Sequence, residues 1–232
     1  MTRDQLARML DHSVLKPEAT ADDIASGAAV VRDERIGFYC VQPCWVRAAT
    51  SALADTNAQI VAVIGFPHGT ERSAIKARAA ALAVDDGARE IDMVQNVGAL
   101  RSGDIGAVAA DIEAVVRAIP GIGVKVILET AVLSDTDIRR ACAIVRDAGA
   151  AFVKTSTGFH AAGGATTKAV ALMRDAVGPA FGVKASGGVG SAADVRKMVE
   201  AGATRIGASV GVKIVQEAKG QTPATPSKAA AY

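Results

Sequence analysis

The sequence is poor in aromatic residues, cysteine and net charge. Aromatic side chains make up 3% of its 232 residues, too few for the stacking platforms that bind single-stranded nucleic acid. Its 26 Lys and Arg residues nearly balance 24 Asp and Glu residues, so net charge gives no reason to expect nucleic acid or an acidic membrane as a partner. Three cysteines in a chain this long do not form a disulfide framework. We therefore expect a reducing, cytoplasmic setting.

Long hydrophobic runs are also missing. No apolar run approaches the roughly 18 residues that a membrane-spanning helix needs. The first residues, Met-Thr-Arg-Asp, include two charged side chains and no apolar stretch follows them, so we expect no secretory signal. Half of the residues are hydrophobic and 22% are charged, which supports a large core and excludes a disordered chain. The composition predicts a soluble globular protein.

Short β-branched runs alternate with alanine-rich helical patterns along the whole chain. We predict strands at 9–14, 37–41, 59–64, 90–94, 123–128, 151–155, 181–184 and 204–207. Helical patterns between them include 72–86, 105–118, 136–148, 167–177 and 192–201. Eight strands with intervening helices predict an α/β protein with a single (β/α)₈ TIM barrel. The alternative, an open doubly wound sheet, would usually show a Gly-x-Gly-x-x-Gly turn, which the sequence does not contain.

The barrel is expected to span residues 1–218 as one catalytic domain. Gly87, Gly149 and Gly202 each follow a helical pattern and precede a strand, as glycines that end helices do. The last residues, 219–232, are polar and contain proline, which is typical of a mobile tail. Tyr232 ends this segment; it could close over a site as part of a lid, or simply end a disordered tail.

Four charged residues interrupt strands that should be apolar. Asp92, Lys125, Lys154 and Lys184 lie in different predicted strands, and parallel strands of a barrel are buried on both faces. Burying an ammonium group costs free energy unless it is paired or its pKa falls. A buried ion pair, or a lysine reaching solvent at a strand end, would explain one such residue. Three lysines in successive strands favour a functional cluster instead.

Crowded lysines indicate carbonyl chemistry. A lysine attacks a carbonyl only as the neutral amine, and its ordinary pKa of about 10.4 leaves little of that form at neutral pH. Desolvation and a neighbouring cation both lower a lysine's pKa. The pattern therefore predicts a Schiff-base nucleophile beside a second lysine, with a carboxylate to move protons. Such an aldolase needs no metal and no other cofactor, and the cysteines and histidines form no metal-ligand motif.

Glycine pairs at 163–164 and 187–188 follow the sixth and seventh predicted strands, and Gly-Ala-Ser at 207–209 follows the eighth. In barrels, the loops after strands seven and eight commonly bind phosphate together with a helix N-terminus. Tight turns alone would also account for glycine pairs. At this place in a barrel they favour a phosphorylated substrate.

Several segments resemble the deoxyribose-phosphate aldolase family. Residues 152–158, Phe-Val-Lys-Thr-Ser-Thr-Gly, closely resemble its Schiff-base segment. Further segments resemble other family motifs in the same order: 11–16, 90–98, 125–130, 184–188, 205–209 and 211–215. The likeness covers about residues 11–215, nearly the whole chain.

The resemblance implies a metal-independent lyase that reversibly cleaves 2-deoxy-D-ribose 5-phosphate to acetaldehyde and D-glyceraldehyde 3-phosphate in deoxynucleoside catabolism. It assigns the Schiff base to Lys154 and proton transfer to Asp92 and Lys184. The substrate-binding residues that we expect are Cys40, Lys125, Thr155, Gly158, Gly187, Gly188 and Ser209. Asp11 and Lys16 are expected to support the site as an ion pair at the end of the first strand.

Two residues depart from the family pattern. Gln42 stands where asparagine or another residue is expected, and Val210 stands where a second serine is common. A missing hydroxyl at Val210 removes one hydrogen bond to phosphate, worth roughly 1.5–3 kcal/mol if charge-assisted, unless a backbone N–H makes the contact.

Other functions stay open on the sequence alone. They are a different lysine-dependent sugar-phosphate aldolase or transaldolase, a non-catalytic sugar-phosphate-binding barrel and a purely structural barrel. The partners expected are a small sugar phosphate and acetaldehyde. Barrels often dimerise, so a homodimer is one expectation.

Overall fold

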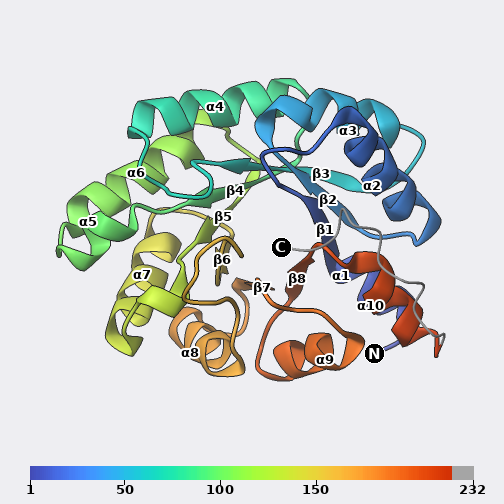
Figure 1. Ribbon diagram of the computed structural model, residues 1–232. Coiled ribbons are helices and arrows are strands. Elements are labelled where there is room, and N and C mark those ends of the chain that lie inside the picture. Colours follow the sequence, from blue (N-terminus) through green and yellow to red (C-terminus); the bar gives the residue numbers. More distant parts are fainter. Residues whose placement is uncertain (221–232) are drawn as a thin grey trace.

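Eight parallel strands close into a barrel that helices surround (Figure 1). The computed structural model describes residues 1–220. The strands follow chain order around the barrel, and β8 closes it by pairing with β1. The predicted (β/α)₈ fold is therefore confirmed. Most of the expected tail, including Tyr232, lies outside the described residues.

The observed elements agree closely with the sequence pattern. The strands are β1 (Leu10–Val14), β2 (Phe38–Val41), β3 (Gln59–Ile64), β4 (Glu90–Val94), β5 (Gly123–Ile127), β6 (Phe152–Lys154), β7 (Gly182–Ser186) and β8 (Arg205–Ala208). The helices are α1 (Arg3–Met9), α2 (Ala21–Asp33), α3 (Val46–Ala52), α4 (Ser73–Asp85), α5 (Val97–Arg101), α6 (Ile105–Ala118), α7 (Asp135–Asp147), α8 (Thr167–Val177), α9 (Ala192–Glu200) and α10 (Gly211–Ala218), with 3₁₀ turns η1 (Pro43–Trp45) and η2 (Thr130–Val132). The five predicted helical patterns correspond to α4 and α6–α9.

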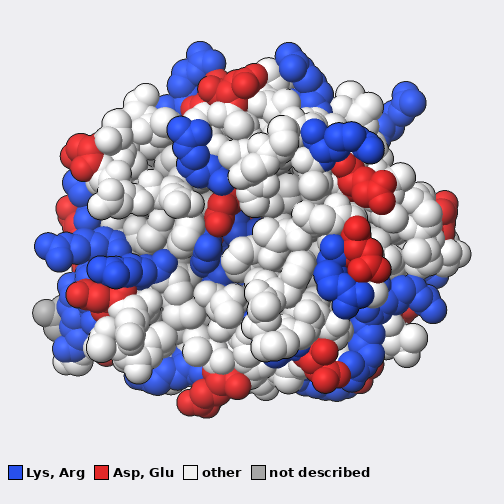
Figure 2. Space-filling view, turned by 180° about the vertical axis from the view of Figure 1, so that it is seen from behind, with Lys and Arg blue, Asp and Glu red and all other residues white. Residues whose placement is uncertain are grey.

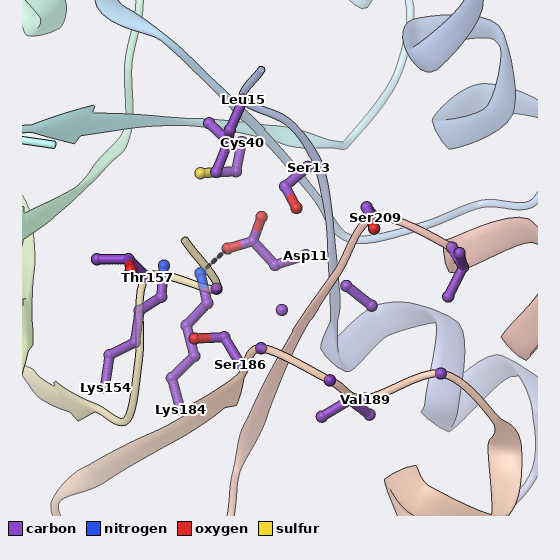
Figure 3. Close-up of a pocket in the computed structure, with 17 residues that line it drawn as sticks. Asp11, Ser13, Leu15, Cys40, Lys154, Thr157, Lys184, Ser186, Val189 and Ser209 are labelled. Carbon is purple, nitrogen blue, oxygen red and sulfur yellow. Dashed lines mark hydrogen bonds and ion pairs between the residues drawn. The ribbon is translucent and has the colours of Figure 1, made fainter. Parts of the chain in front are cut away.

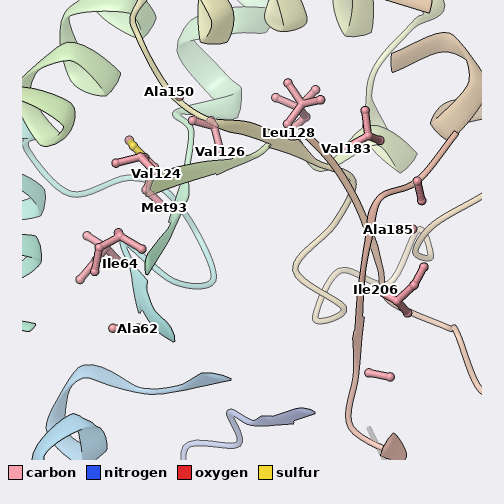
Figure 4. Packing of buried hydrophobic residues seen from close by; sticks show 14 of the residues in the cluster. Ala62, Ile64, Met93, Val124, Val126, Leu128, Ala150, Val183, Ala185 and Ile206 are labelled. Carbon is pink, nitrogen blue, oxygen red and sulfur yellow. The ribbon is translucent and has the colours of Figure 1, made fainter. Parts of the chain in front are cut away.

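The two faces of each strand meet different surroundings, because successive side chains point to opposite sides. In β5, Val124 and Val126 belong to the large apolar cluster between the sheet and the helices (Figure 4). Lys125, between them, contacts Asp92 of β4. The helix-facing side is thus apolar, and charged residues can occupy the opposite face.

The barrel interior is itself divided. A small apolar cluster of Leu15, Cys40, Val61 and Val63 comes from β3, β2 and the end of β1. Buried charged side chains come instead from β1, β4, β5, β6, β7 and β8: Asp11, Asp92, Lys125, Lys154, Lys184 and Arg205. Side chains able to take part in a reaction therefore lie in the polar half of the interior.

Three helices end in the same type of turn, and each turn directs the chain into the next strand. Gly87, Gly149 and Gly202 follow α4, α7 and α9 with φ angles of 117°, 82° and 114°. In each turn, the N–H after the glycine bonds to a carbonyl five residues back: Ala88 to Ala83 at 2.9 Å, Ala150 to Val145 at 3.2 Å and Ala203 to Met198 at 2.9 Å. This is the Schellman geometry, which needs a residue that tolerates positive φ. The prediction that these glycines end helices is confirmed.

The outer surface carries charge of both signs. On the face shown in Figure 2, basic and acidic side chains are interspersed. Within residues 1–220, none of the helices combines the length and the apolar character that crossing a membrane requires.

Two of the helix-ending glycines provide a matched test of this turn. A Cβ added at Gly149 meets only Val116 Cγ1 at 3.7 Å, so Gly149→Ala should cost about 1 kcal/mol for the left-handed backbone. A Cβ at Gly87 would lie 2.4 Å from Thr50 Oγ1 and 2.6 Å from its Cγ2, so Gly87→Ala should cost roughly 2–4 kcal/mol. Urea unfolding measures both free energies, and equal losses would contradict this interpretation.

Candidate active site

A cavity opens at the carboxyl end of the barrel strands, where TIM-barrel active sites lie. Its volume is about 250 Å³, slightly below the roughly 300–1,000 Å³ typical of pockets for drug-sized molecules. In Figure 3, Leu15 and Cys40 lie toward one side of Lys154 and Lys184, and Ser209 toward another. The cavity thus suits a small metabolite that is apolar at one end.

Asp92 is the point at which the buried lysines of the barrel strands meet. Its Oδ2 accepts hydrogen bonds from Lys154 Nζ and Lys184 Nζ, both at 2.7 Å. Its Oδ1 accepts from Lys125 Nζ at 2.9 Å. The sheet register creates this meeting, because Asp92 pairs directly with Lys125, and Lys154 with Lys184. One fully buried carboxylate therefore binds three ammonium groups.

The network extends beyond Asp92 in two directions. Lys184 also donates to Asp11 Oδ2. Lys125 Nζ lies 2.6 Å from Glu90 Oε2, which also pairs with Arg205 at 2.9 Å. With every group ionised, this network of four cations and three carboxylates carries one excess positive charge. It becomes neutral when one lysine loses its proton.

Mutual interactions determine the charge states of two of these groups. Burial alone would raise the pKa of the Asp92 carboxyl, but the three lysines hold it well below its ordinary value. Burial alone would lower the pKa of Lys184, but Asp11 and Asp92 raise it more, so the net pKa lies above the ordinary lysine value. Asp92 is consequently a carboxylate and Lys184 an ammonium at neutral pH.

The Lys154 and Lys184 side chains thus reach the cavity, with the Asp92 carboxylate bonded to both of them. An amine there can add to an aldehyde, and the adjacent charged pair can give and take protons. Lys154 and Lys184 line the cavity, whereas Lys125 and Asp92 lie outside its lining.

Comparison with known proteins gives a consistent result. A family model described as DeoC/LacD family aldolase matches residues 3–217. A curated deoxyribose-phosphate aldolase of Macrococcus caseolyticus is 52% identical over 217 residues, covering 93% of this chain and 98% of the relative. Another, of Enterococcus faecalis, is 49% identical over 218 residues, covering 94% and 99%.

A solved structure agrees with these relatives. The deoxyribose phosphate aldolase of Aeropyrum pernix, described as a tetramer, superposes with a TM-score of 0.86 at 30% identity, covering 94% of this chain and 92% of that one. The chain belongs to the DeoC/LacD aldolase family.

Most of the residues predicted for the aldolase site meet in one place. Those that line the cavity are Asp11, Cys40, Lys154, Gly158, Lys184, Gly187, Gly188 and Ser209. Asp92 contacts both lysines. Burial and the neighbouring carboxylates of Asp11 and Asp92 raise the pKa of the Cys40 thiol, so it stays protonated.

Three predicted residues lie elsewhere. Lys125 contacts Asp92 and Glu90 and does not line the cavity. Thr155 Oγ1 donates to the Ser186 carbonyl and accepts from the Ser186 N–H, both at 3.0 Å, and so ties β6 to β7. The predicted ion pair between Asp11 and Lys16 is wrong: Asp11 bonds to Lys184, because Asp11 lies within β1 whereas Lys16 lies beyond the end of that strand.

The aldolase cavity also contains residues that the sequence analysis did not single out as site residues: Ser13, Leu15, Thr157, Ser186, Val189 and Gly190. The alternation of strand side chains, counted from Asp11, points to Ser13 and Leu15. The two unusual residues have distinct places. Gln42 Nε2 donates to the Leu15 carbonyl at 2.9 Å, whereas Val210 lines the cavity at the N-cap of α10 without a side-chain capping bond.

Asp11, Cys40 and Asp92 could offer ligand atoms within 4.8 Å of one another. The ammonium groups of Lys154 and Lys184 already bond to the carboxylate oxygens there. A metal ion at this point would face two positive charges, so the donor set does not suit one.

Replacing Asp92 tests how much the three lysines depend on it. Asp92→Asn should lower the free energy of unfolding by about 3–5 kcal/mol, because buried ammonium groups lose their shared counter-charge. The pKa of the Asp92 carboxyl is depressed in the folded protein. Its contribution to the free energy of unfolding is therefore fully present above its unfolded-state pKa of about 3.9 and is lost as the pH falls below that value.

Urea unfolding from about pH 7 to about pH 3 measures both effects. The unsubstituted protein should lose more stability than Asp92→Asn between about pH 5 and about pH 3. Equal acid sensitivity of the two proteins would show that Asp92 does not hold this role.

Proposed function

We propose that this protein is a class I aldolase that reversibly cleaves 2-deoxy-D-ribose 5-phosphate to acetaldehyde and D-glyceraldehyde 3-phosphate. The observation that carries the proposal is the position of Lys154, which lines the cavity and bonds to Asp92 beside Lys184. Curated relatives about half identical to this chain are named deoxyribose-phosphate aldolase, which supports the same substrate here.

Lys154 is the Schiff-base lysine in this proposal. Lys125 does not line the cavity, and two carboxylates hold it, those of Glu90 and Asp92. Lys184 lines the cavity, but its raised pKa keeps it protonated. Lys154 has only the shared carboxylate of Asp92 as an ion-pair partner among the described residues. It is therefore the least tightly paired of the three lysines, and it lies where an amine can attack a carbonyl in the cavity.

The reaction then proceeds in four steps. The Lys154 amine adds to C1 of the open-chain sugar, and loss of water from the carbinolamine gives a protonated imine. Asp92 and Lys184, through a solvent water, take the proton of the C3 hydroxyl. The C2–C3 bond breaks, and C3 becomes the aldehyde carbon of glyceraldehyde 3-phosphate. The electron pair of the broken bond forms the C1–C2 double bond of an enamine on Lys154. Protonation at C2 and hydrolysis release acetaldehyde and restore the lysine.

The lining of the cavity gives the substrate an orientation. The C1–C2 end, which has no hydroxyl on C2, fits the apolar side formed by Leu15 and Cys40. The phosphate fits the side formed by the loops after β7 and β8, where Val210, the N-cap residue of α10, lines the cavity and the helix N-terminus favours negative charge. Gly187, Gly188 and Ser209 belong to that side.

The wider setting follows from the same proposal. The reaction places the protein in deoxynucleoside catabolism. Three free cysteines suit a reducing cytoplasm. The tetramer described for the Aeropyrum pernix relative supports a homo-oligomer, of which a dimer is the simplest form.

Removing the Lys154 amine tests the assignment. Lys154→Met should reduce cleavage of deoxyribose 5-phosphate more than about a thousandfold, because no imine can form. It should fold, because the loss of one ammonium group leaves the three remaining cations of the network balanced by its three carboxylates. Acetaldehyde release followed by a coupled reductase assay measures turnover, with Lys168→Met as the control, since the side chain of Lys168 is 75% exposed. Turnover retained by folded Lys154→Met would contradict the mechanism.

A further inference from the structure

We propose that Glu129 is a positioning residue for substrate binding that acts through Thr157, and this inference rests on the proposed aldolase function. Glu129 lies two residues after the end of β5 and is the N-cap residue of the η2 turn. It does not line the cavity, whereas Thr157, three residues after Lys154, does.

Glu129 combines two energetically unfavourable features. Its backbone is left-handed, with φ 57° and ψ 58°, a conformation that residues other than glycine, asparagine and aspartate rarely adopt. It is also 4% exposed, and no cation within residues 1–220 forms a salt bridge with it. Strain and a buried carboxylate without a counter-charge persist where the surroundings require them, most often at functional sites.

Hydrogen bonds from Thr157 account for that position. Glu129 Oε2 accepts the Thr157 hydroxyl at 2.6 Å, and its two carboxylate oxygens lie 3.3 and 3.4 Å from the Thr157 backbone nitrogen. The Thr157 hydroxyl in turn accepts from the Phe159 N–H at 3.1 Å. Its one proton is committed to Glu129, so both its orientation and the bend of the chain after β6 are determined.

The bend positions a second loop by direct backbone contact. An added Cβ at Gly187 would lie 3.3 Å from the Gly158 Cα and 3.0 Å from the Gly164 Cα. Ala165 N–H also donates to the Gly187 carbonyl at 2.9 Å. The loops after β6 and β7 thus pack closely where these glycines meet, and the Ser186 hydroxyl donates to the Ser156 carbonyl at 2.6 Å beside them. The chain of contacts leads from Glu129 through Thr157 to the glycines on the phosphate side of the cavity.

Lys154 itself does not need Glu129. It pairs with Ile127 of β5 and Lys184 of β7 in the barrel register, and its ammonium group bonds to Asp92. The loss of Glu129 should therefore weaken binding of the phosphorylated sugar while leaving imine formation at Lys154 intact. A residue that only stabilised the barrel would not separate these two properties.

Glu129→Gln tests the inference, because it removes the negative charge and one of the two acceptor oxygens that the Thr157 hydroxyl and N–H bond to, and leaves weaker neutral hydrogen bonds. The KM for deoxyribose 5-phosphate should rise about tenfold, the loss expected of one hydrogen bond to a charged group. The rate at which borohydride traps acetaldehyde on Lys154 should stay within about twofold. Glu113→Gln, at an exposed position in α6, is the matched control.

Thr157 supplies the second arm. Thr157→Val removes the hydroxyl and should also raise KM, Thr157→Ser should restore it, and the double variant of Glu129→Gln and Thr157→Val should lose less than the two single effects combined. An unchanged KM in both single variants, additive effects, or an equal loss of acetaldehyde trapping would overturn the inference. If Glu129→Gln does not fold, the Thr157 variants decide.

The same measurements separate this inference from the proposed function. If the unsubstituted protein forms no acetaldehyde adduct, the aldolase proposal itself fails. If the adduct forms and only the KM prediction fails, the role of Glu129 alone is rejected.

Discussion

The site depends on one electrostatic constraint: a single buried carboxylate, Asp92, must neutralise ammonium groups from three neighbouring strands. Closing the sheet into a barrel brings these side chains to one interior. The direct pairing of Asp92 with Lys125, and of Lys154 with Lys184, brings them to hydrogen-bonding distance. A shift of one residue in either register would turn a charged side chain toward the helices.

Hydrophobic burial on the helix-facing side of the sheet offsets the free-energy cost of the buried charged network. Buried ion pairs are often no more stabilising than hydrophobic residues of the same volume, so the network itself is weak evidence of a structural role. The large cluster between sheet and helices supplies the hydrophobic burial, with Val124 and Val126 on one face of the strand that carries Lys125. Because the helix-facing side of the sheet provides the stability, the barrel interior can hold the charged residues that the reaction needs.

Much of the fold and the centre of the site could be predicted from the sequence. The alternation of apolar runs and helical patterns was enough to predict the barrel. The charged residues in strands that should be buried were enough to predict that Asp92, Lys154 and Lys184 lie together. The partner of Asp11 could not be predicted, because its contact with Lys184 spans 173 residues and exists only once β8 closes onto β1. The left-handed backbone of Glu129 carries no signal in residue type, since glutamate rarely adopts it.

The same limit applies to residues that act through others. Glu90, held between Lys125 and Arg205, reads as an ordinary polar residue at the start of a strand. Thr155 lies next to the predicted nucleophile, yet its hydroxyl bonds to Ser186. Adjacency in sequence indicated a substrate contact there, whereas the two-residue alternation of β6 turns Thr155 away from the cavity that Lys154 lines.

The most direct test of the account is to trap the imine. The protein is mixed with acetaldehyde, reduced with borohydride, digested and mapped by mass spectrometry. We predict one ethyl group on Lys154, competed away by deoxyribose 5-phosphate. An adduct on Lys125 or Lys184 instead, or none on any of the three under conditions that leave surface lysines unmodified, would contradict the central claim that Asp92 and Lys184 prepare Lys154 for attack.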